Sequence, residues 1–295
     1  LKKYWPIYLM LLPGVLYFLV FKYGPMYGIT IAFKDYMSRE GILGSPWADP
    51  WYKYFKQFFD SPYATRVIVN TVTISLYKIV FGMFPPVMLA ILINECRSSK
   101  YKRVVQTVSY LPHFLSWVIV YGIMTALFSQ STGIVNSWIT SLGGESIPFL
   151  TSPDTFRGMV VGSSIWKEVG WGSIMYLAAL TNIDPALYEA ASIDGCSRFK
   201  RIIKITLPCL RSVFLMSLVL RMGSVLEAGF DQLYIMLNDG VLSVGEIIDT
   251  WSFKQGLVRM NYSLGTAGGL MKSVIALVMM LMANRLAKRW GENVW

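Results

Sequence analysis

The chain has 295 residues, of which 54% are hydrophobic and only 15% charged, and its mean hydropathy is +0.47. A soluble domain carries about a quarter charged residues, so this composition excludes an ordinary water-soluble fold and predicts about six spans of roughly 20 residues in a lipid membrane. The net charge of +10 indicates basic cytoplasmic loops rather than a surface for nucleic acid, because the charges flank long apolar runs that are rich in aromatic residues. We therefore expect an all-α integral membrane protein with no nucleic-acid partner.

The first apolar run covers residues 6–20 and can extend to Phe33. Lys2 and Lys3 precede it, but no small-residue cleavage site follows, so we expect a retained first span rather than a removed signal peptide. Five further apolar runs predict five more spans, at residues 67–93, 104–128, 158–180, 213–237 and 264–283. No linker or repeat divides them. We expect one transmembrane domain over residues 1–295, with its core at residues 67–285.

Between the first two spans, residues 51–59 place aromatic side chains at helical spacing, with lysines and a glutamine on the other side. This pattern predicts an amphipathic helix that lies in the plane of the membrane interface. An ordinary aromatic-rich loop is the alternative. The aromatic residues are Trp51, Tyr54, Phe55, Phe58 and Phe59.

The distribution of lysine and arginine among the predicted loops gives an orientation. One set of alternating loops, with both termini, holds 14 of these residues, and the other set holds 7. Cytoplasmic loops carry the excess of positive charge. We therefore expect a multi-pass protein of the plasma (inner) membrane with both termini in the cytoplasm.

Two predicted spans carry polar groups that a single lipid-facing helix does not tolerate. The fourth span holds Lys167 and Glu168 between two tryptophans, and charges interrupt the fifth. Aromatic faces and charges at bilayer depth suit a sugar or a uronate, which makes these residues candidates for a substrate cavity. The alternative is that Lys167 pairs with Glu168, and Arg221 with a carboxylate, inside the helix bundle. The candidate cavity residues are Trp166, Glu168, Trp171, Arg221, Glu227 and Asp231.

The sequence predicts neither a metal site nor a cofactor bound by this chain. Cys96, Cys196 and Cys209 are widely spaced and form no CxxC pair. His113 is the chain's single histidine. We expect free thiols, no disulfide framework and no zinc site, and a hydrogen-bonded interior role for His113 rather than a role as ligand or proton relay.

The loop between the fourth and fifth spans, residues 182–208, carries clear helix signals. Asp184 is a good N-cap with Pro185 at the first helical position, and Gly195 is a good terminator, so we expect a short helix at residues 185–194. Ser197 can cap a second helix, and Pro208 is expected to bend the chain into the fifth span. The first helix suits docking into a groove on a cytosolic partner, and a plain amphipathic connector is the alternative.

The same loop resembles the EAA loop of binding-protein-dependent ABC importer permeases. The matching residues are Glu189-Ala190-Ala191, Asp194-Gly195, Ile205 and Leu207-Pro208. Residues 184–188 and 166–170 resemble the carbohydrate-uptake branch of this family. Residues 24–28, 31–36 and 44–47 resemble its LplB/YteP-like subgroup, which takes up complex polysaccharides and oligosaccharides. Cys196 departs from the pattern, because the family commonly has alanine there.

The resemblance implies an ABC type I importer (MetI-like) permease fold and a MalF-type transmembrane subunit. It implies that the EAA loop docks on an ABC ATPase dimer, which uses ATP and Mg. The sequence has no GxxxxGK[ST] phosphate loop, so we expect a permease rather than an enzyme. Further implied partners are a second permease subunit in a heterodimer, an extracytoplasmic solute-binding protein and an oligosaccharide. The implied coupling residues are Glu189, Ala190, Ala191, Asp194 and Gly195.

Other functions stay open from the residues alone. An ABC permease for a non-sugar solute would share the EAA loop. An ion-coupled carrier or a membrane enzyme could use Glu168, Glu227 or Asp231. The sequence does not favour the enzyme, because it places no paired carboxylates, metal cluster or nucleophile with its base at a recognisable spacing. It does not favour the carrier, because an ion-coupled protein does not need an EAA loop.

Overall fold

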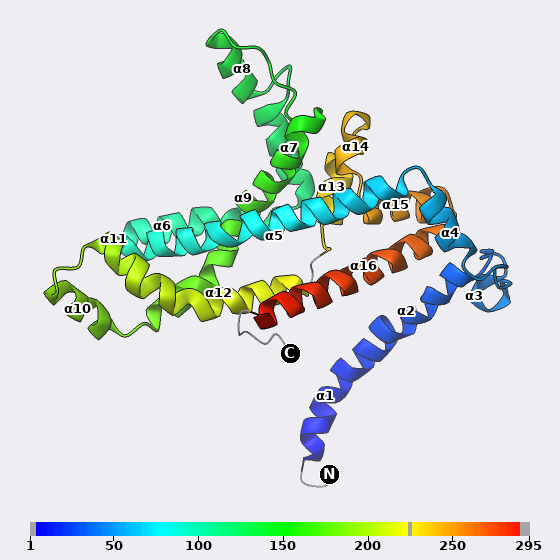
Figure 1. Ribbon diagram of the computed structural model, residues 1–295, viewed down its shortest axis with the longest axis horizontal. Helices are drawn as coiled ribbons and strands as arrows, with labels where there is room; N and C mark the ends of the chain where they lie inside the picture. The colour runs from blue at the N-terminus through cyan, green and yellow to red at the C-terminus, as the bar shows by residue number, and fades with distance from the viewer. Residues whose placement is uncertain (1–3, 224–225, 290–295) are drawn as a thin grey trace. The chain divides into compact units, whose positions relative to one another are not determined.

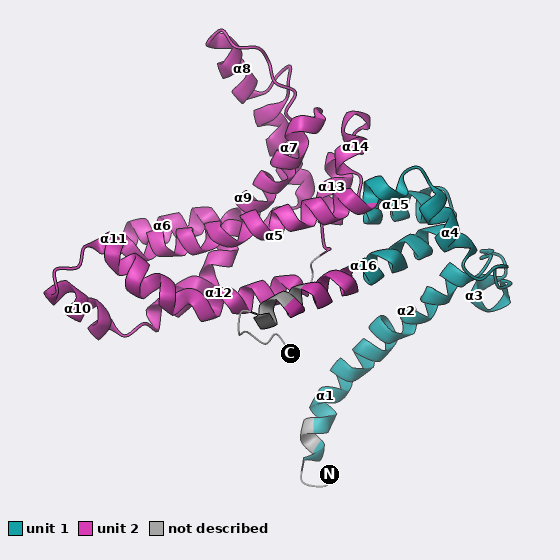
Figure 2. Ribbon diagram, in the orientation of Figure 1, with its two compact units in different colours: residues 1–67, 248–275 teal, residues 68–247, 276–295 magenta. Residues whose placement is uncertain are grey.

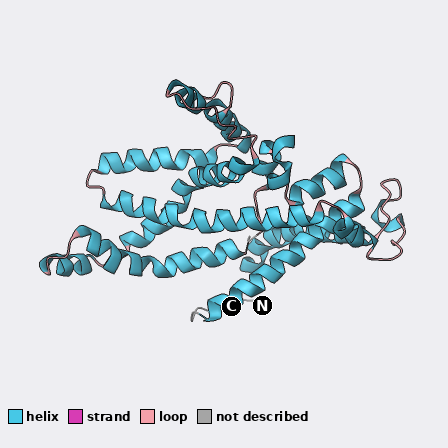
Figure 3. Cartoon of the chain, turned by 45° about the horizontal axis from the view of Figure 1, so that its top comes forward, coloured by secondary structure: helices cyan, strands magenta, loops and turns pink. Residues whose placement is uncertain are grey.

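The computed structural model of the protein describes residues 4–223 and 226–289. Within these ranges the chain is helical and contains no sheet (Figures 1 and 3), apart from an isolated antiparallel bridge between Lys34 and Trp47. The predicted all-α architecture is confirmed.

The chain packs as two compact units (Figure 2). The first consists of residues 1–67 and 248–275, and the second of residues 68–247 and 276–295. Two long helices, α5 (Ala64–Glu95) and α16 (Tyr262–Arg289), pass from one unit into the other. The organisation of residues 1–295 as one domain stays a prediction.

The first unit begins with a helical stretch that runs to Phe33, as the longer version of the first span predicts. It is built from α1 (Trp5–Phe18), the π-helix η1 (Leu19–Tyr23), α2 (Gly24–Met26) and the 3₁₀-helix η2 (Tyr27–Phe33). The unit is completed by the first part of α16 and by α3 (Gly41–Gly44), α4 (Lys53–Asp60), α15 (Ile248–Phe253) and the π-helix η6 (Lys254–Val258).

Helix α4 is the amphipathic helix predicted from residues 51–59. Part of its aromatic face packs within the chain. Phe58 is fully buried and meets the Trp251 ring edge to face, with 5.0 Å between centroids. Phe55 packs 5.2 Å from the Phe33 ring. These contacts account for part of the aromatic periodicity, and the position of α4 in the membrane plane stays a prediction.

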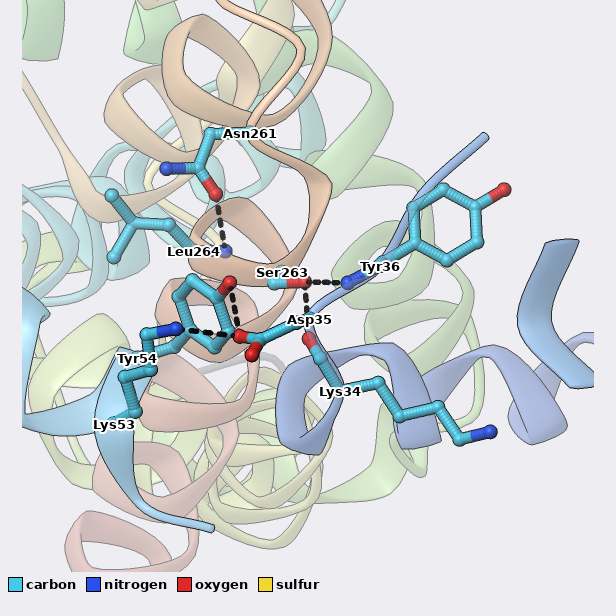
Figure 4. A network of polar contacts seen from close by, with 8 residues as sticks. All are labelled: Lys34, Asp35, Tyr36, Lys53, Tyr54, Asn261, Ser263 and Leu264. Atoms are coloured by element: carbon cyan, nitrogen blue, oxygen red, sulfur yellow. Dashed lines mark hydrogen bonds and ion pairs between the residues drawn. The ribbon is translucent and has the colours of Figure 1, made fainter. Parts of the chain in front are cut away.

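A polar network joins three segments of the first unit (Figure 4). Oδ1 of Asp35 accepts hydrogen bonds from the Lys53 ammonium and the Tyr54 hydroxyl of α4, each at 2.8 Å. The Ser263 hydroxyl, near the start of α16, donates to the Lys34 carbonyl at 2.6 Å and accepts the Tyr36 amide at 3.2 Å. The segment that follows the first span is therefore fixed to both α4 and α16.

Charge strengthens this network at neutral pH. The hydrogen bond from Lys53, and after it the one from Tyr54, holds the pKa of Asp35 below its ordinary 3.8. The same bond raises the pKa of Lys53 above 10.5. The lowered pKa of Asp35 stabilises the fold above pH 3.8, and this stabilisation is lost as the pH falls through the folded-state pKa. The raised pKa of Lys53 stabilises the fold below pH 10.5, and this stabilisation is lost as the pH rises through the folded-state pKa.

The second unit contains the remaining helices and two buried apolar clusters. One cluster surrounds Phe156 and Leu233, and the other surrounds Tyr176 and Leu210. Its helices are α6 (Ser99–Tyr110), η3 (Leu111–Phe114), α7 (Trp117–Phe128), α8 (Ile134–Ser141), α9 (Pro153–Thr181), α10 (Pro185–Ile193), α11 (Arg198–Arg201), η4 (Ile202–Thr206), α12 (Leu207–Met222), α13 (Phe230–Met236), η5 (Asp239–Val241) and α14 (Leu242–Gly245).

Four stretches of the described chain are long and apolar enough to cross a membrane: Tyr8–Phe33, Ala64–Glu95, Arg198–Met222 and Tyr262–Met282. A bent pair of helices would bring the number to five if the pair forms one span. Helix α9, which contains the fourth predicted span, has the length, at 29 residues. It is less apolar because it carries Lys167 and Glu168 among glycines and serines. The count of six spans stays a prediction, with α9 as the sixth.

The third predicted span is not one straight helix. Residues 99–114 and 117–128 form two helices that meet at an angle of 109°. Pro112 lies in the short 3₁₀ turn η3, Leu115 is extended, and the Ser116 hydroxyl caps α7 by accepting the Ile119 amide at 3.4 Å. A hydropathy run does not distinguish a broken helix from a continuous one, so the span at residues 104–128 stays a prediction, with two helices in place of one.

The fifth predicted span, residues 213–237, was also wrong in its bounds. The helix runs from Arg198 to Met222, and α13 begins only at Phe230. Gly229 adopts a left-handed backbone, with φ of +91°, immediately before α13. Pro208 is the second residue of α12, which directly follows the π-helix η4, so the helical stretch continues past it. The bend expected at Pro208 stays a prediction. Glu227 and Asp231 therefore lie beyond the span, and Arg221 lies in its last turn.

Glycines allow the closest helix contact of α9. A Cβ atom on Gly170 would lie 1.9 Å from the Ser109 carbonyl oxygen at the end of α6. A Cβ atom on Gly172 would lie 3.2 Å from the Pro86 ring of α5. Small residues permit such close packing between membrane helices.

We predict that Gly170→Ala destabilises the protein by about 1–3 kcal/mol or more, because the added methyl group overlaps backbone that has little freedom to move. Thermal unfolding of the purified protein in detergent measures this effect. Gly162→Ala on the same helix is the control, since a Cβ atom there meets nothing within 4 Å. Equal unfolding temperatures for the two variants would contradict the close approach.

We predict that Asp35→Ala loosens the polar network of the first unit at pH 7. Amide hydrogen exchange should accelerate at Tyr36 and in the first turn of α4, because Lys53 and Tyr54 lose their shared acceptor. The control is Glu40→Ala, which removes an exposed carboxylate outside the network. In the unmodified protein, exchange corrected for its intrinsic pH dependence should accelerate only when the pH falls below 3.8.

Candidate functional site

A cavity of about 480 Å³ in the second unit brings together four of the six residues predicted to line a substrate site. Glu168 and Trp171 come from α9, Arg221 from the end of α12, and Glu227 from the segment before α13. The cavity combines two carboxylates, a guanidinium and an indole. This set offers both charge pairing and an aromatic surface to a polar ligand.

Lys78 supplies a further cation that the sequence reading missed. Its ammonium group donates to the Ala228 carbonyl at 2.7 Å and to Oε1 of Gln232. Gln232 is itself buried, and its amide donates to the Val160 carbonyl at 2.8 Å and to the Ser163 hydroxyl at 2.9 Å. This chain of bonds fixes the position of the Lys78 head group at the cavity wall.

The turn before α13 is shaped by the same lysine. A Cβ atom on Gly229 would lie 2.7 Å from Nζ of Lys78. The left-handed backbone at Gly229 adds a second reason for glycine at this position. Both observations place the lysine tightly against the segment that carries Glu227.

Glu168 is held by the single histidine. Nδ1 of His113 lies 2.8 Å from Oε2 of Glu168. The imidazole also stacks on the Trp171 ring, with 4.5 Å between centroids and 2° between planes. His113 is half-buried. The histidine is thus the hydrogen-bonded residue that the sequence predicts. The Phe114 ring also packs on Trp171, with 5.7 Å between centroids, and Trp171 borders the cavity.

Lys167 has an interior role. Its side chain is buried, and Nζ donates to the Pro112 carbonyl at 3.3 Å and to the His113 carbonyl. These carbonyls belong to η3, where the helix ends at the break before α7. Nζ also lies 3.8 Å from Oε1 of Glu168. The alternative that Lys167 pairs with Glu168 inside the helix bundle therefore describes Lys167. Glu168, in contrast, also lines the cavity.

Two of the predicted cavity residues lie elsewhere. Trp166 lines a separate apolar groove of about 380 Å³ between α7 and α9. Asp231 is exposed on α13 and is absent from the cavity lining. A helix turns by about 100° per residue, so Trp166 and Trp171 point to different sides of α9. Hydropathy identified the helix but not the face.

Two lining residues were not predicted from the sequence, and one of them carries a signal that could have identified it. Lys78 is a lone cation in a predicted span, which by itself marks a functional position. Trp117 lines the cavity because α7 turns away at the break. Its position could not be predicted once residues 104–128 were interpreted as one helix.

The EAA loop folds as its capping signals predict. Helix α10 spans Pro185–Ile193, the Asp184 carboxylate accepts the Ala186 amide at 2.9 Å, and Gly195 has φ of +69°. The Ser197 hydroxyl caps the following helix by accepting the Lys200 amide at 3.4 Å. The turn at Gly195 re-aims the chain between two helices, and a left-handed backbone is the reason for glycine there.

Helix α10 is fixed to the helix that follows it. The hydroxyl groups of Tyr188 and Thr206 share a hydrogen bond of 3.0 Å, and the Arg201 guanidinium donates to the Ser192 hydroxyl at 2.7 Å. A push on α10 would therefore be transmitted to η4 and α12.

The opposite surface of the loop is uncovered within the chain. Of the five predicted coupling residues, Ala191 is half-buried and Glu189, Ala190, Asp194 and Gly195 are exposed. Ile193 and Phe199 are 87% and 71% exposed. Large apolar side chains beside exposed charges mark a protein-contact surface.

Metal binding finds no support among the described residues. They contain no group of three or more histidine, cysteine, aspartate or glutamate side chains placed to hold an ion. Cys96, Cys196 and Cys209 are free thiols, as predicted.

A family model for the inner membrane component of binding-protein-dependent transport systems matches residues 82–292. The chain belongs to this family. The match contains the cavity lining from Gly82 onward and the whole EAA loop. The protein is accordingly an integral membrane permease, a transport component rather than an enzyme.

Similar proteins narrow the assignment. The permease is 46% identical to the protein LplB of Bacillus subtilis strain 168, over 97% of this chain and 90% of LplB. It is 43% identical to the polygalacturonan/rhamnogalacturonan transport system permease protein YteP of the same organism, over 99% of this chain and 90% of YteP. The predicted subgroup is confirmed.

A solved structure confirms the predicted MetI-like permease fold. One chain of the crystal structure of a bacterial alginate ABC transporter, in complex with its alginate pentasaccharide-bound periplasmic protein, is 40% identical to the permease. The TM-score is 0.87, and the match covers 99% of this chain and 97% of that chain.

We predict that Trp171→Ala weakens the response of transport to sugar by about 1–3 kcal/mol, the range for a planar ring stacked on an aromatic side chain. The measurement is the sugar concentration that half-maximally stimulates uptake. Trp166→Ala is the matched control, because its indole lies in the separate groove. An equal loss in both variants, or loss of complex assembly in Trp171→Ala alone, would assign Trp171 to packing.

Proposed function

We propose that this permease imports an oligosaccharide together with a second permease chain, an ABC ATPase dimer and an extracytoplasmic solute-binding protein. The observation that carries the proposal is the cavity of the second unit, which sets the Trp171 ring beside four charged side chains. Sugars present both an apolar ring face and hydroxyl groups, and such a wall meets both. The relatives named for polysaccharide transport support the same class of substrate.

The cavity favours a sugar that carries carboxylates. Lys78 has three ammonium protons, and two of them are used by Ala228 and Gln232. The third has no acceptor among the described residues, and it borders the cavity together with the Arg221 guanidinium. Glu168 is engaged by His113, which reduces its repulsion of an anionic ligand. Polygalacturonan and alginate, named for similar proteins, are acidic polymers.

Energy for import would enter through the EAA loop. We place α10 in a groove of the ATPase, where closure of the ATPase pair on ATP and Mg displaces α10. The hydrogen bonds of Tyr188 and Arg201 then transmit this displacement to the fifth span. The fifth span carries Arg221 at its far end. A movement at the loop would in this way reach the cavity.

The same assignment sets the orientation. An EAA loop that docks on an ATPase lies in the cytoplasm, which agrees with the excess of lysine and arginine on that side. Both termini would then be cytoplasmic, in a protein of the plasma (inner) membrane.

Uptake into proteoliposomes tests the function. The full complex, with ATP inside and a binding protein loaded with tetragalacturonate outside, should accumulate the sugar. An imposed proton or sodium gradient without ATP should drive no uptake. Uptake that follows the ion gradient and ignores ATP would replace the importer with an ion-coupled carrier.

We predict that Glu189→Ala and Gly195→Val abolish most ATP-driven uptake and retention of the ATPase, at normal expression. Glu189 is exposed, so its loss should change folding stability by no more than about 0.5 kcal/mol. Gly195→Val strains a left-handed turn that has open space around it. The controls are Glu145→Ala, an exposed carboxylate, and Gly143→Val, a left-handed glycine with open space. Normal coupling in both loop variants would make the loop a connector.

A further inference from the structure

The first unit contains a second cavity, of about 760 Å³, at the chain segment that leads into α5. Its walls come from α4, from residues 61–63 and from the α15–η6 segment. Cavities that bind small ligands measure about 300–1,000 Å³, so this one has room for one or two sugar units. The substrate cavity of the second unit shares none of these residues.

The lining of this outer cavity is cationic. Lys53, Lys56 and Arg259 contribute three positive charges, and Asp60 contributes the single negative charge among the lining residues. Lys53 is already bonded to Asp35, as Figure 4 shows. Lys56 and Arg259 are exposed, and a bond of 3.5 Å to the Gln255 side chain orients the Arg259 guanidinium. Two cationic groups therefore remain for a ligand.

The cavity also offers aromatic surface and amide groups. Tyr52 and Tyr63 are 45% and 46% exposed. Trp251 is buried, and its indole nitrogen has no hydrogen-bond partner within the described part of the chain. Gln57 supplies a second amide beside Gln255. Rings, amides and cations in one concavity are the groups that recognise a carboxylated sugar.

Its walls are fixed before any ligand binds. Asp35 holds the first turn of α4 through Lys53 and Tyr54, and the buried Phe58 ring packs on Trp251. The Asn261 side chain caps the start of α16 by accepting the Leu264 amide at 3.2 Å. Preformed walls lower the entropic cost of binding.

Chain topology places this cavity on the far side of the membrane from the EAA loop. It is lined by Tyr63, which directly precedes α5. The other half of α5 packs through Ala90 against Leu180 and Ile183, at the entry to the EAA loop. Helix α5 has 32 residues and is long and apolar enough to cross the bilayer once. We therefore assign its two ends to opposite compartments.

We propose that the cavity around Lys56 and Arg259 is a receiving site for one carboxylated sugar unit of the incoming oligosaccharide, on the outer face of the permease. The proposal rests on the proposed import function for the identity of the ligand. A sugar fits the site better than an acidic loop of the binding protein does, because the cationic groups surround a concavity with aromatic and amide walls instead of a flat patch.

The experiment measures binding of tetragalacturonate to the full complex in nanodiscs, without binding protein and without ATP, by isothermal titration calorimetry. The variant Lys56→Gln/Arg259→Gln should bind at least about tenfold more weakly, the loss that follows when a charge-assisted hydrogen bond is removed. Arg39→Gln, an exposed basic residue of the same unit outside the cavity, should bind normally. The methyl-esterified tetramer should bind the unmodified complex as weakly as tetragalacturonate binds the double variant.

Three results would overturn the proposal. Equal affinity of the double variant and Arg39→Gln would remove the site. Equal affinity of the acidic and esterified tetramers would remove the carboxylate as the recognised group. Unchanged sugar affinity with weakened capture of the empty binding protein would reassign the cavity to a protein contact. ATP-driven uptake measured in the same complex keeps these outcomes separate from the import function, because uptake that persists leaves that function intact.

Discussion

The bonds from the Lys167 ammonium to the carbonyls of η3 organise the permease site. A helix that breaks leaves carbonyl groups with unfilled hydrogen-bonding capacity, which lipid does not satisfy. The Leu115 amide donates to the Pro112 carbonyl, and Lys167 supplies a further donor from α9 to the carbonyls of Pro112 and His113, while it remains buried and close to Glu168. These bonds stabilise the break, at which the two helices meet at 109°.

The rest of the cavity follows from that break. The turn places His113 where its ring reaches Glu168 and covers one face of Trp171. It also brings Trp117 at the start of α7 to the cavity wall. At Gly170 the backbones of α6 and α9 approach so closely that no side chain would fit between them. The positions of His113, Glu168 and Trp171 therefore depend on this backbone packing as well as on the Lys167 bonds.

The EAA loop and the first unit are stabilised by different interactions. At the EAA loop, local caps and two side-chain bonds make a small rigid body with an uncovered face, which suits a contact that is pushed and pulled. In the first unit, a charged network around Asp35 and an aromatic stack fix the outer segments. Both arrangements satisfy polar groups through side chains of neighbouring segments.

The sequence by itself determined the membrane class, the family and the local structure of the EAA loop. Composition fixes the class, and a cap, a proline and a glycine fix α10, because these effects act within a few residues. Only the tertiary structure decided which side of α9 faces the cavity, that Lys78 reaches it, and that Trp166 and Asp231 do not. It also decided where the third span breaks and where the fifth begins. Hydropathy averages over a window of neighbouring residues. The break at Pro112, in contrast, is stabilised by a hydrogen-bond donor, Lys167, that lies 55 residues further along the chain.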